Sequence, residues 1–358
     1  MDLGKRAERS IKRAVFGRLL GRRGTEPGPV DLAQLRRVLV VRANFRMGNL
    51  LLVTPALAAL RRALPDARID VVAPRAYVDL LAHSPDVDER IGVDRRMLTA
   101  PWSLLGLVRR LRAERYDLAL DGGRGSSFLG AFLVGVSGSR RRVASAGSRY
   151  EALFDTLVPV DAGLRHKVDL LLAVLEGVGI PTTTRSPSVT VTEDEREEAA
   201  ARWRTLGVVP EKPAIAVNIG ARGTKRWPVD RVAELVRSLH GEHDRPVILI
   251  AGPEDEERLA EMRPQLPSGV AVAPRMAIRP FAAFISQAAV LVTQDTGPLH
   301  LAAAVGVPTV ALLVAPRSAA FAPRGILDRA VYTGSSARVP KVVEAVRSVL
   351  DRAPAARR

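Results

Sequence analysis

At 358 residues the chain is too long for one ordinary hydrophobic core, and a prior of about 150 residues per domain favours two domains. Hydrophobic residues make up 47% and charged residues 26%, which excludes a disordered chain and one built mainly of membrane spans. The absence of cysteine excludes disulfides and thiolate metal sites, and the net charge of +16 favours an anionic partner: phosphates, nucleic acid or a membrane surface.

The first 30 residues are expected to form a basic amphipathic segment and a linker. Residues 1–23 carry eight basic and two acidic side chains, with an apolar residue at every fourth position from Leu3 to Leu19. The pattern predicts a helix that attaches to an anionic membrane surface, or else a solvated tail or a helix docked on the protein body. No apolar run is long enough for a signal peptide or a transmembrane helix. We therefore expect a cytoplasmic protein, peripheral on the inner face of the cell membrane if the segment attaches.

Beyond the linker, short β-rich runs alternate with longer helical patterns. The expected strands are 37–42, 68–74, 116–122, 214–220, 246–252, 269–274, 289–295 and 308–314. This rhythm predicts an α/β protein with two doubly wound parallel-sheet domains at 31–182 and 183–335, followed by a C-terminal helix and tail at 336–358. Ligands of open α/β sheets bind beyond the carboxyl ends of the strands. We therefore expect the functional residues in those loops, and the site in the cleft between the domains.

Three strand-end loops carry unusual chemistry, and the first is RANFRMGNLL at 42–51. It joins the strand at 38–41 to a helix expected to begin near Leu50. Gly48 is expected to let the backbone turn tightly with its amide free, and Asn49 follows it. Taken alone, the loop also fits an ordinary strand-to-helix turn.

The second loop, NIGARGTKRWP at 218–228, combines glycines with two cations ahead of the next helix. Gly220 frees the backbone, while Lys225 and Arg226 lie beside the helix N-terminus. Backbone amides, a helix N-terminus and cations together suit a phosphate group. Since the chain has only six lysines, Lys225 stands out here. The alternative is a solvated basic turn.

The third loop, QDTGPLHLAAAVG at 294–306, lies between a strand and a helix rich in small residues. Asp295 is expected to cap that helix, Thr296 and Gly297 to present amides to a phosphate, and His300 to lie one turn inside. Alone, it also fits a capped helix with a buried His300. Asp-Thr-Gly also surrounds the aspartates of aspartic proteases, but those lie in all-β lobes.

As an ordered set, these loops resemble glycosyltransferase family 9, the ADP-heptose:lipopolysaccharide heptosyltransferases. The resemblance covers roughly residues 36–350 and runs through VLVVRANFRMGNLLLVTPAL, LPDARIDVVAP, YDLALDGGRGS, GARGTKRWPVDRVAEL, LIAGPEDEERLA and DTGPLHLAAAVGVPTVAL. It implies the GT-B fold, in which two Rossmann-like domains face a cleft and the C-terminal one holds the donor nucleotide.

The resemblance also implies roles for individual residues. It implies that Lys225 and the amides of Thr296 and Gly297 bind the donor diphosphate. It implies further that Asp295 and His300 contact the sugar, and that Glu254 or Glu256 contacts the ribose hydroxyls. GT-B enzymes generally need no bound metal, so it implies no cofactor, with cations and helix ends neutralising the donor. The DVD sequence at 86–88 is accordingly expected to be a loop and not a metal-binding pair.

One position departs from the family pattern. The family motif is Gly-Asp, with the aspartate proposed as the general base for the acceptor hydroxyl, whereas this chain has Gly48-Asn49. An amide cannot accept a proton at neutral pH. In an active transferase another group must take the proton, and Asp121, at the end of a strand in the same domain, is the candidate. Asn49 would then orient the acceptor by hydrogen bonds.

The function we expect is transfer of a sugar, such as a heptose, from a nucleotide-diphosphate donor of the ADP-heptose type to a cell-envelope glycan or lipid-linked acceptor. The alternative is a catalytically inactive nucleotide-sugar-binding protein, because of Asn49. A third class, nucleic-acid binding driven by charge, has no recognised motif or aromatic-basic interleaving behind it, and we expect no nucleic-acid partner.

Overall fold

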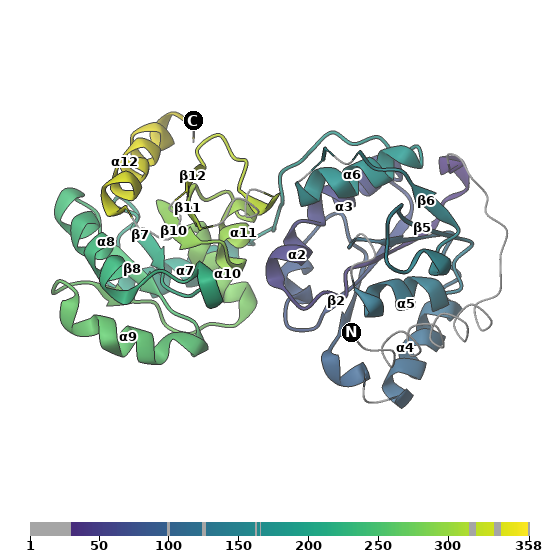
Figure 1. The fold of residues 1–358 in the computed structure, drawn as a ribbon, viewed down its shortest axis with the longest axis horizontal. Coiled ribbons are helices and arrows are strands. Elements are labelled where there is room, and N and C mark those ends of the chain that lie inside the picture. Colours follow the sequence, from purple (N-terminus) through teal and green to yellow (C-terminus); the bar gives the residue numbers. More distant parts are fainter. Residues whose placement is uncertain are drawn as a thin grey trace, which may run out of the picture. The chain divides into compact units, whose positions relative to one another are not determined.

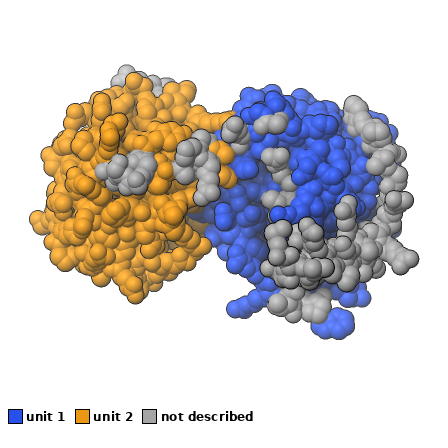
Figure 2. All heavy atoms as spheres, in the orientation of Figure 1, with its two compact units in different colours: residues 1–185 blue, residues 186–358 orange. Residues whose placement is uncertain are grey.

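The computed structural model describes residues 30–98, 101–123, 127–161, 163–164, 166–314, 320–332 and 338–356. The amphipathic segment expected at 1–23 lies outside these residues. The chain divides into two compact units, Met1–Arg185 and Ser186–Arg358 (Figure 2). No helix in the described ranges is long and apolar enough to cross a membrane.

Unit 1 is built on a six-stranded parallel sheet with the strand order β3-β2-β1-β4-β5-β6 (Figure 1). Its strands are β1 Arg37–Val41, β2 Arg68–Pro74, β3 Glu89–Val93, β4 Leu118–Asp121, β5 Arg141–Ser145 and β6 Thr156–Val158. Its helices are α2 Met47–Leu51, α3 Thr54–Ala63, α4 Pro101–Ala113, α5 Phe128–Val136 and α6 Lys167–Gly177, with 3₁₀ turns η1 Leu32–Gln34, η2 Val78–Leu81, η3 Arg95–Leu98 and η4 Glu151–Leu153.

Helices cover both faces of this sheet. α5 packs on β1 and β4 with α4 beside it, and α3 packs with α6, which contacts β5. Because both faces are covered, the central strands are nearly continuous apolar runs, and Val38 to Val41 are fully buried.

Unit 2 repeats this architecture with the order β12-β11-β10-β7-β8-β9. Its strands are β7 Ile215–Asn218, β8 Val247–Ile250, β9 Ala271–Val272, β10 Val290–Gln294, β11 Thr309–Leu313 and β12 Arg329–Tyr332. Its helices are α7 Glu193–Thr205, α8 Val229–Glu242, α9 Glu256–Met262, α10 Ile278–Ser286, α11 Gly297–Ala304 and α12 Val339–Ala356, with 3₁₀ turns η5 Gly223–Lys225, η6 Pro253–Asp255 and η7 Arg263–Gln265. The expected C-terminal helix, α12, packs on α8 and β11 and so belongs to the core of this unit.

Both sheets have the strand order of a Rossmann fold, in which the chain winds outward from the centre in both directions. The direction changes between β1 and β4 in unit 1 and between β7 and β10 in unit 2. Ligands of such sheets bind at this switch point, outside the carboxyl ends of the strands. The three unusual loops follow β1, β7 and β10, and Asp121 is the last residue of β4. Each unit therefore carries its candidate residues at its own switch point.

The loop after β1 differs from the expectation. The helix expected from Leu50 is two helices, α2 and α3, and Pro55 lies in the first turn of α3, where its missing N–H costs no hydrogen bond. Gly48 and Asn49 consequently lie inside α2, which begins at Met47. The backbone of Gly48 is helical, so the tight turn expected at this glycine is wrong.

Candidate functional site

In unit 1, Arg42 joins the two sides of the switch point. Its Nε donates a hydrogen bond to the main-chain oxygen of Asn49 at 3.0 Å, and its guanidinium is close enough to Asp121 to be stabilised by that carboxylate. Burial lowers the pKa of Arg42 to about 10, and the charge of Asp121 opposes this shift. Arg42 is therefore still cationic at neutral pH.

The backbone next to Asp121 is shaped around this pair. The amide of Gly123 donates to Oδ1 of Asp121 at 2.9 Å. A Cβ added at Gly123 would lie 2.4 Å from Nη1 of Arg42 and 3.0 Å from Oδ1 of Asp121. Only glycine leaves room here for the guanidinium and the carboxylate together.

The structure thus brings Asn49 and Asp121 to one switch point, but in different settings. Asp121 is 3% exposed, with the Gly123 amide and the buried Arg42 guanidinium as neighbours. Asn49 is partly exposed, and its side-chain amide makes no hydrogen bond to another described residue. The amide of Asn49 can therefore meet a ligand, whereas Asp121 already serves as a counter-ion. The role of Asp121 as a general base stays a prediction.

In unit 2, Lys225 and Asp295 connect the loops that follow β7 and β10. Nζ of Lys225 lies 2.5 Å from Oδ2 of Asp295 and 3.3 Å from its main-chain oxygen. The Asp295 side chain is buried, whereas that of Lys225 is 40% exposed. The ammonium group therefore remains reachable by an anionic ligand while the carboxylate fixes its position.

Asp295 does not cap α11, so that expectation is wrong. Thr296 is the N-cap residue, and its side chain makes no capping hydrogen bond to the helix. Instead, its hydroxyl oxygen accepts from Nδ2 of Asn218 at 3.3 Å. The first amides of α11, including that of Gly297, are left without a side-chain cap. An uncapped helix N-terminus beside a cation is a suitable environment for a phosphate group.

Asn218 is a candidate site residue that the sequence motifs did not indicate. Its Nδ2 also donates to the main-chain oxygen of Gly220 at 2.9 Å and to Oγ1 of Thr293 at 2.9 Å. It thereby ties the loop after β7 to the end of β10. The signal for it was a buried amide at the last position of an otherwise apolar strand, where a polar side chain must find partners.

The acidic segment after β8 holds its carboxylates in two ways. Glu254 and Glu256 are exposed and pair with Arg222 and Arg275, respectively. Asp255 between them is buried, accepts the amide of Gly252 at 2.9 Å and lies 3.3 Å from Nη2 of Arg226. The contact of either glutamate with a ribose stays a prediction.

Asp255 also explains Gly220. A Cβ at Gly220 would lie 2.5 Å from Oδ2 of Asp255, so glycine is needed for this close approach and not for an unusual φ. The buried carboxylate thus supports the loop that carries Lys225, whereas the sequence prediction for this segment concerned only Glu254 or Glu256 at the ribose hydroxyls.

His300 lies on α11 and is buried, with its ring edge-on to Phe321 at a centroid distance of 6.2 Å. Its contact with the sugar of a donor stays a prediction. The DVD sequence is a structural loop, as expected: Asp88 accepts the amide of Ile69 at 2.7 Å and pairs with Arg61. Within the described ranges, no group of three or more His, Asp or Glu side chains is placed to hold a metal ion.

Comparison with known proteins gives related sequences over most of the chain. Lipopolysaccharide heptosyltransferase 3 of Escherichia coli is 24% identical over 284 residues, which cover 74% of this chain and 80% of that protein. Lipopolysaccharide heptosyltransferase 2 of Escherichia coli (strain K12) is 27% identical over 312 residues, covering 80% and 85%, respectively.

Solved structures share the fold. The glycosyl transferase family 9 structure from Veillonella parvula DSM 2008 superposes with a TM-score of 0.79 at 23% identity, covering 88% of this chain and 97% of that one. E. coli ADP-heptose lps heptosyltransferase II superposes with a TM-score of 0.72 at 23% identity, covering 88% and 99%. The two-domain α/β GT-B fold expected from the resemblance is therefore confirmed.

A family model for glycosyltransferase family 9 (heptosyltransferase) matches residues 104–345, more than half of the chain. Together with the loops at both switch points, this match identifies the chain as a member of glycosyltransferase family 9.

Proposed function

We propose that this protein transfers a heptose from an ADP-heptose-type donor to a lipopolysaccharide-type glycan or lipid-linked acceptor. The relatives named lipopolysaccharide heptosyltransferase 2 and 3 support the sugar and the class of acceptor. Unit 2 takes the donor and unit 1 the acceptor. We also propose that transfer takes place on the cytoplasmic side of the cell membrane.

The observation that carries this proposal is the pairing of Lys225 with Asp295 beside the uncapped start of α11. When the sugar leaves its nucleotide, negative charge develops on the diphosphate. A fixed cation and a helix N-terminus stabilise that charge without moving, because their positions are set before the reaction. Asp295 sets the position of the ammonium group, and Asn218 sets the backbone around it.

In unit 1, Asn49 orients the acceptor hydroxyl, because its amide can both donate and accept a hydrogen bond. The proton of that hydroxyl has two destinations. One is Asp121, which would have to take up the proton close to the buried, positively charged Arg42 guanidinium. The other is an ionised phosphate or carboxylate on the acceptor itself.

One observation favours a second candidate, a nucleotide-sugar-binding protein without transferase activity. Asn49 occupies the place where the family pattern has a proposed base, and its amide cannot take up a proton. The donor loops of unit 2 do not depend on this residue, so donor binding would survive a loss of chemistry.

Binding and turnover separate these two candidates. Calorimetry should show saturable binding of ADP and of ADP-heptose, whether the protein is a transferase or only a binding protein. If neither ligand binds, the proposed donor is wrong. Incubation with ADP-heptose and a heptose-deficient lipopolysaccharide acceptor should release ADP and add mass to the acceptor. Binding of ADP-heptose without any release of ADP would show that the protein binds the donor but does not transfer its sugar.

A further inference from the structure

An apolar surface lies at the carboxyl end of the unit 1 sheet, outside the groups discussed so far. Trp102 and Leu105 near the start of α4 are 82% and 37% exposed, and Phe128 at the start of α5 is 39% exposed. Of the described residues of unit 1, these are three of the four exposed large hydrophobic side chains, the fourth being Leu157. Such side chains are costly to leave in water, so their concentration calls for an explanation.

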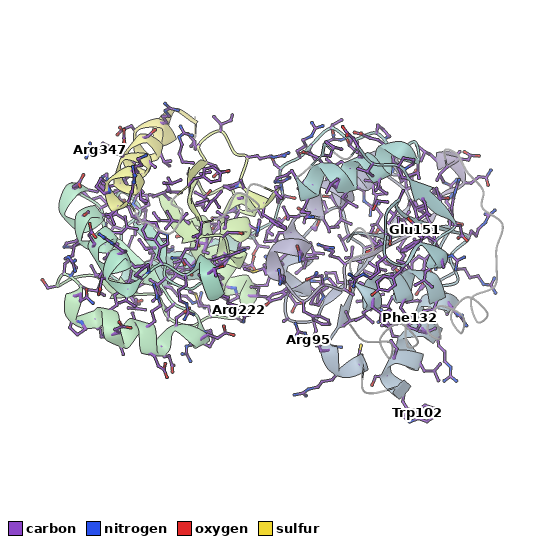
Figure 3. All side chains as sticks on the ribbon, in the orientation of Figure 1. Arg95, Trp102, Phe132, Glu151, Arg222 and Arg347 are labelled. Atoms are coloured by element: carbon purple, nitrogen blue, oxygen red, sulfur yellow. The ribbon has the colours of Figure 1, made fainter. Side chains whose placement is uncertain are left out.

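The strand order places these three residues at one edge. α4 follows the carboxyl end of β3, and α5 follows the carboxyl end of β4. Both helices therefore begin at the edge of the sheet that also carries Asn49. Figure 3 shows Trp102 projecting outward from α4.

Phe128 is exposed but held by other rings. Its ring stacks on Phe132 at a centroid distance of 5.9 Å and meets Tyr150 edge-on at 5.6 Å. Phe132 and Tyr150 pack in turn on the buried core of unit 1. The aromatic surface is therefore a fixed part of the fold.

The outer face of α4 changes character along its length. Leu107 and Leu111 point into the core, whereas Trp102, Leu105 and Arg109 follow one another at helical spacing on the exposed side. The face is apolar at the carboxyl edge of the sheet and basic farther along the helix. This is the amphipathic pattern of a helix that lies at a lipid–water interface.

Unpaired arginines flank the apolar surface. Arg46, Arg95 and Arg149 follow the carboxyl ends of β1, β3 and β5, are exposed, and form no ion pair with another described residue. Arg95 lies instead over the ring of Phe45, 5.1 Å from its centroid.

Asp94 and Glu151, which follow the carboxyl ends of β3 and β5, are already engaged. Asp94 lies 3.8 Å from Nε of Arg75 and accepts the amide of Arg96, and Glu151 accepts the amide of Gly147 at 2.7 Å. Their charges are therefore partly compensated within the fold, whereas those of Arg46, Arg95 and Arg149 are not. In the strand order β3-β2-β1-β4-β5, basic and apolar side chains therefore follow one another along this edge.

We propose that this edge of unit 1 docks on an anionic lipid bilayer. Trp102, Leu105 and Phe128 enter the interfacial region, where an indole ring places its apolar body among acyl chains and its N–H among headgroups. Arg46, Arg95 and Arg149 contact lipid phosphates by charge-assisted hydrogen bonds. The docked edge brings Asn49 toward the membrane surface. The inference does not depend on transferase activity.

Trp102 provides a local optical test. The chain has three tryptophans, and Trp203 and Trp227 are buried, so the response of the fluorescence to solvent comes from Trp102. We expect vesicles of phosphatidylglycerol and phosphatidylethanolamine to shift the emission of the full chain to shorter wavelength and to protect it from a water-soluble quencher. Phosphatidylcholine vesicles should do neither, and Trp102→Phe should abolish the response.

Sedimentation with the same vesicles tests the surface as a whole. The variant Trp102→Ser/Leu105→Ser and the variant Arg95→Glu should each bind anionic vesicles at least about 5-fold more weakly than the unaltered chain. The matched control is Val209→Ser/Ile326→Ser, which removes two exposed apolar side chains of unit 2 and should leave vesicle binding unchanged. Circular dichroism checks that each variant is folded.

Three results would overturn the proposal. The first is sedimentation of the full chain with anionic vesicles while the Trp102 emission stays unchanged, because another segment then makes the contact. The second is equal binding by the unaltered chain and the Trp102→Ser/Leu105→Ser variant. The third is an equal response to phosphatidylcholine, because the surface then recognises no anionic charge.

Discussion

Nε of Arg42 donates a hydrogen bond to the main-chain oxygen of Asn49, 3.0 Å away, and thereby holds the helix turn that carries this residue. The bond uses the backbone of Asn49 and leaves its side chain to a ligand. Arg42 is itself charged, buried and close to Asp121. The three residues form one unit at the switch point of the first sheet, and a change in one should be felt by the other two.

Replacing Asn49 by Asp tests which group takes the proton. If the chain is a silent relative, Asn49→Asp should create transfer, since a positioned general base typically contributes about 10²- to 10⁴-fold in rate. If the chain is an active transferase, the same change should raise the rate little. Release of ADP in the presence of acceptor measures both cases, and the affinity for ADP should remain that of the unaltered protein. A change in ADP affinity would mean that Asn49 acts on the donor instead.

Replacing Asp121 by Asn should destabilise the protein. The change removes the carboxylate whose charge favours the buried Arg42 guanidinium and which accepts the amide of Gly123. Removing one partner of a directly paired buried ion costs about 3–5 kcal/mol, and we expect a smaller loss of stability here. Asp244→Asn is the matched control, because Asp244 pairs with Lys212 at the surface, where water screens the charges and the pair contributes little to stability. Urea unfolding measures both variants. An unchanged midpoint for Asp121→Asn, combined with a loss of transfer of 100-fold or more, would instead identify Asp121 as the base.

Replacing Lys225 by Ala should weaken the binding of ADP and ADP-heptose by about 2–4 kcal/mol, as when one partner of a desolvated charge pair is truncated. Lys212→Ala is the control, because it also removes one lysine of an ion pair, but on the surface away from both loops. Calorimetry at constant ionic strength compares the two. Equal donor affinity in Lys225→Ala and the unaltered protein would remove Lys225 from the donor site.

Replacing Gly220 by Ala should disturb the donor loop without any change of charge. The new Cβ would lie 2.5 Å from Oδ2 of Asp255, so the carboxylate or the loop must move. We expect donor affinity to fall by at least about 10-fold, corresponding to about 1.4 kcal/mol. Gly241→Ala in α8 is the control, because a Cβ there meets nothing within 4 Å and should stabilise the helix by about 0.5–1 kcal/mol. A Gly220→Ala variant with full donor affinity would show that the loop geometry does not matter.

The strands that the sequence predicted are those with strong local signals. RIDVVAP coincides with β2, and the runs around β1, β4, β7, β8, β10 and β11 are apolar segments bounded by polar or turn-forming residues. β3, β5, β6 and β12 were not predicted: charged residues interrupt the apolar pattern of β3, β5 and β12, and β6 has only three residues. β5 shows how the fold accommodates such a residue: Arg142 is buried there because Asp155, 13 positions later, takes its guanidinium.

The sequence by itself determined the fold class, the family and the three loops, because hydrophobic period, glycine position and motif spacing are local properties of the chain. Only the tertiary structure decided which charged groups meet. Parallel pairing of β1 with β4 sets Val41 beside Asp121, and pairing of β7 with β10 sets Asn218 beside Thr293. The closeness of Arg42 to Asp121 and the ion pair of Lys225 with Asp295 follow from these registers. Register depends on the packing of whole strands and helices, and no short stretch of sequence encodes it.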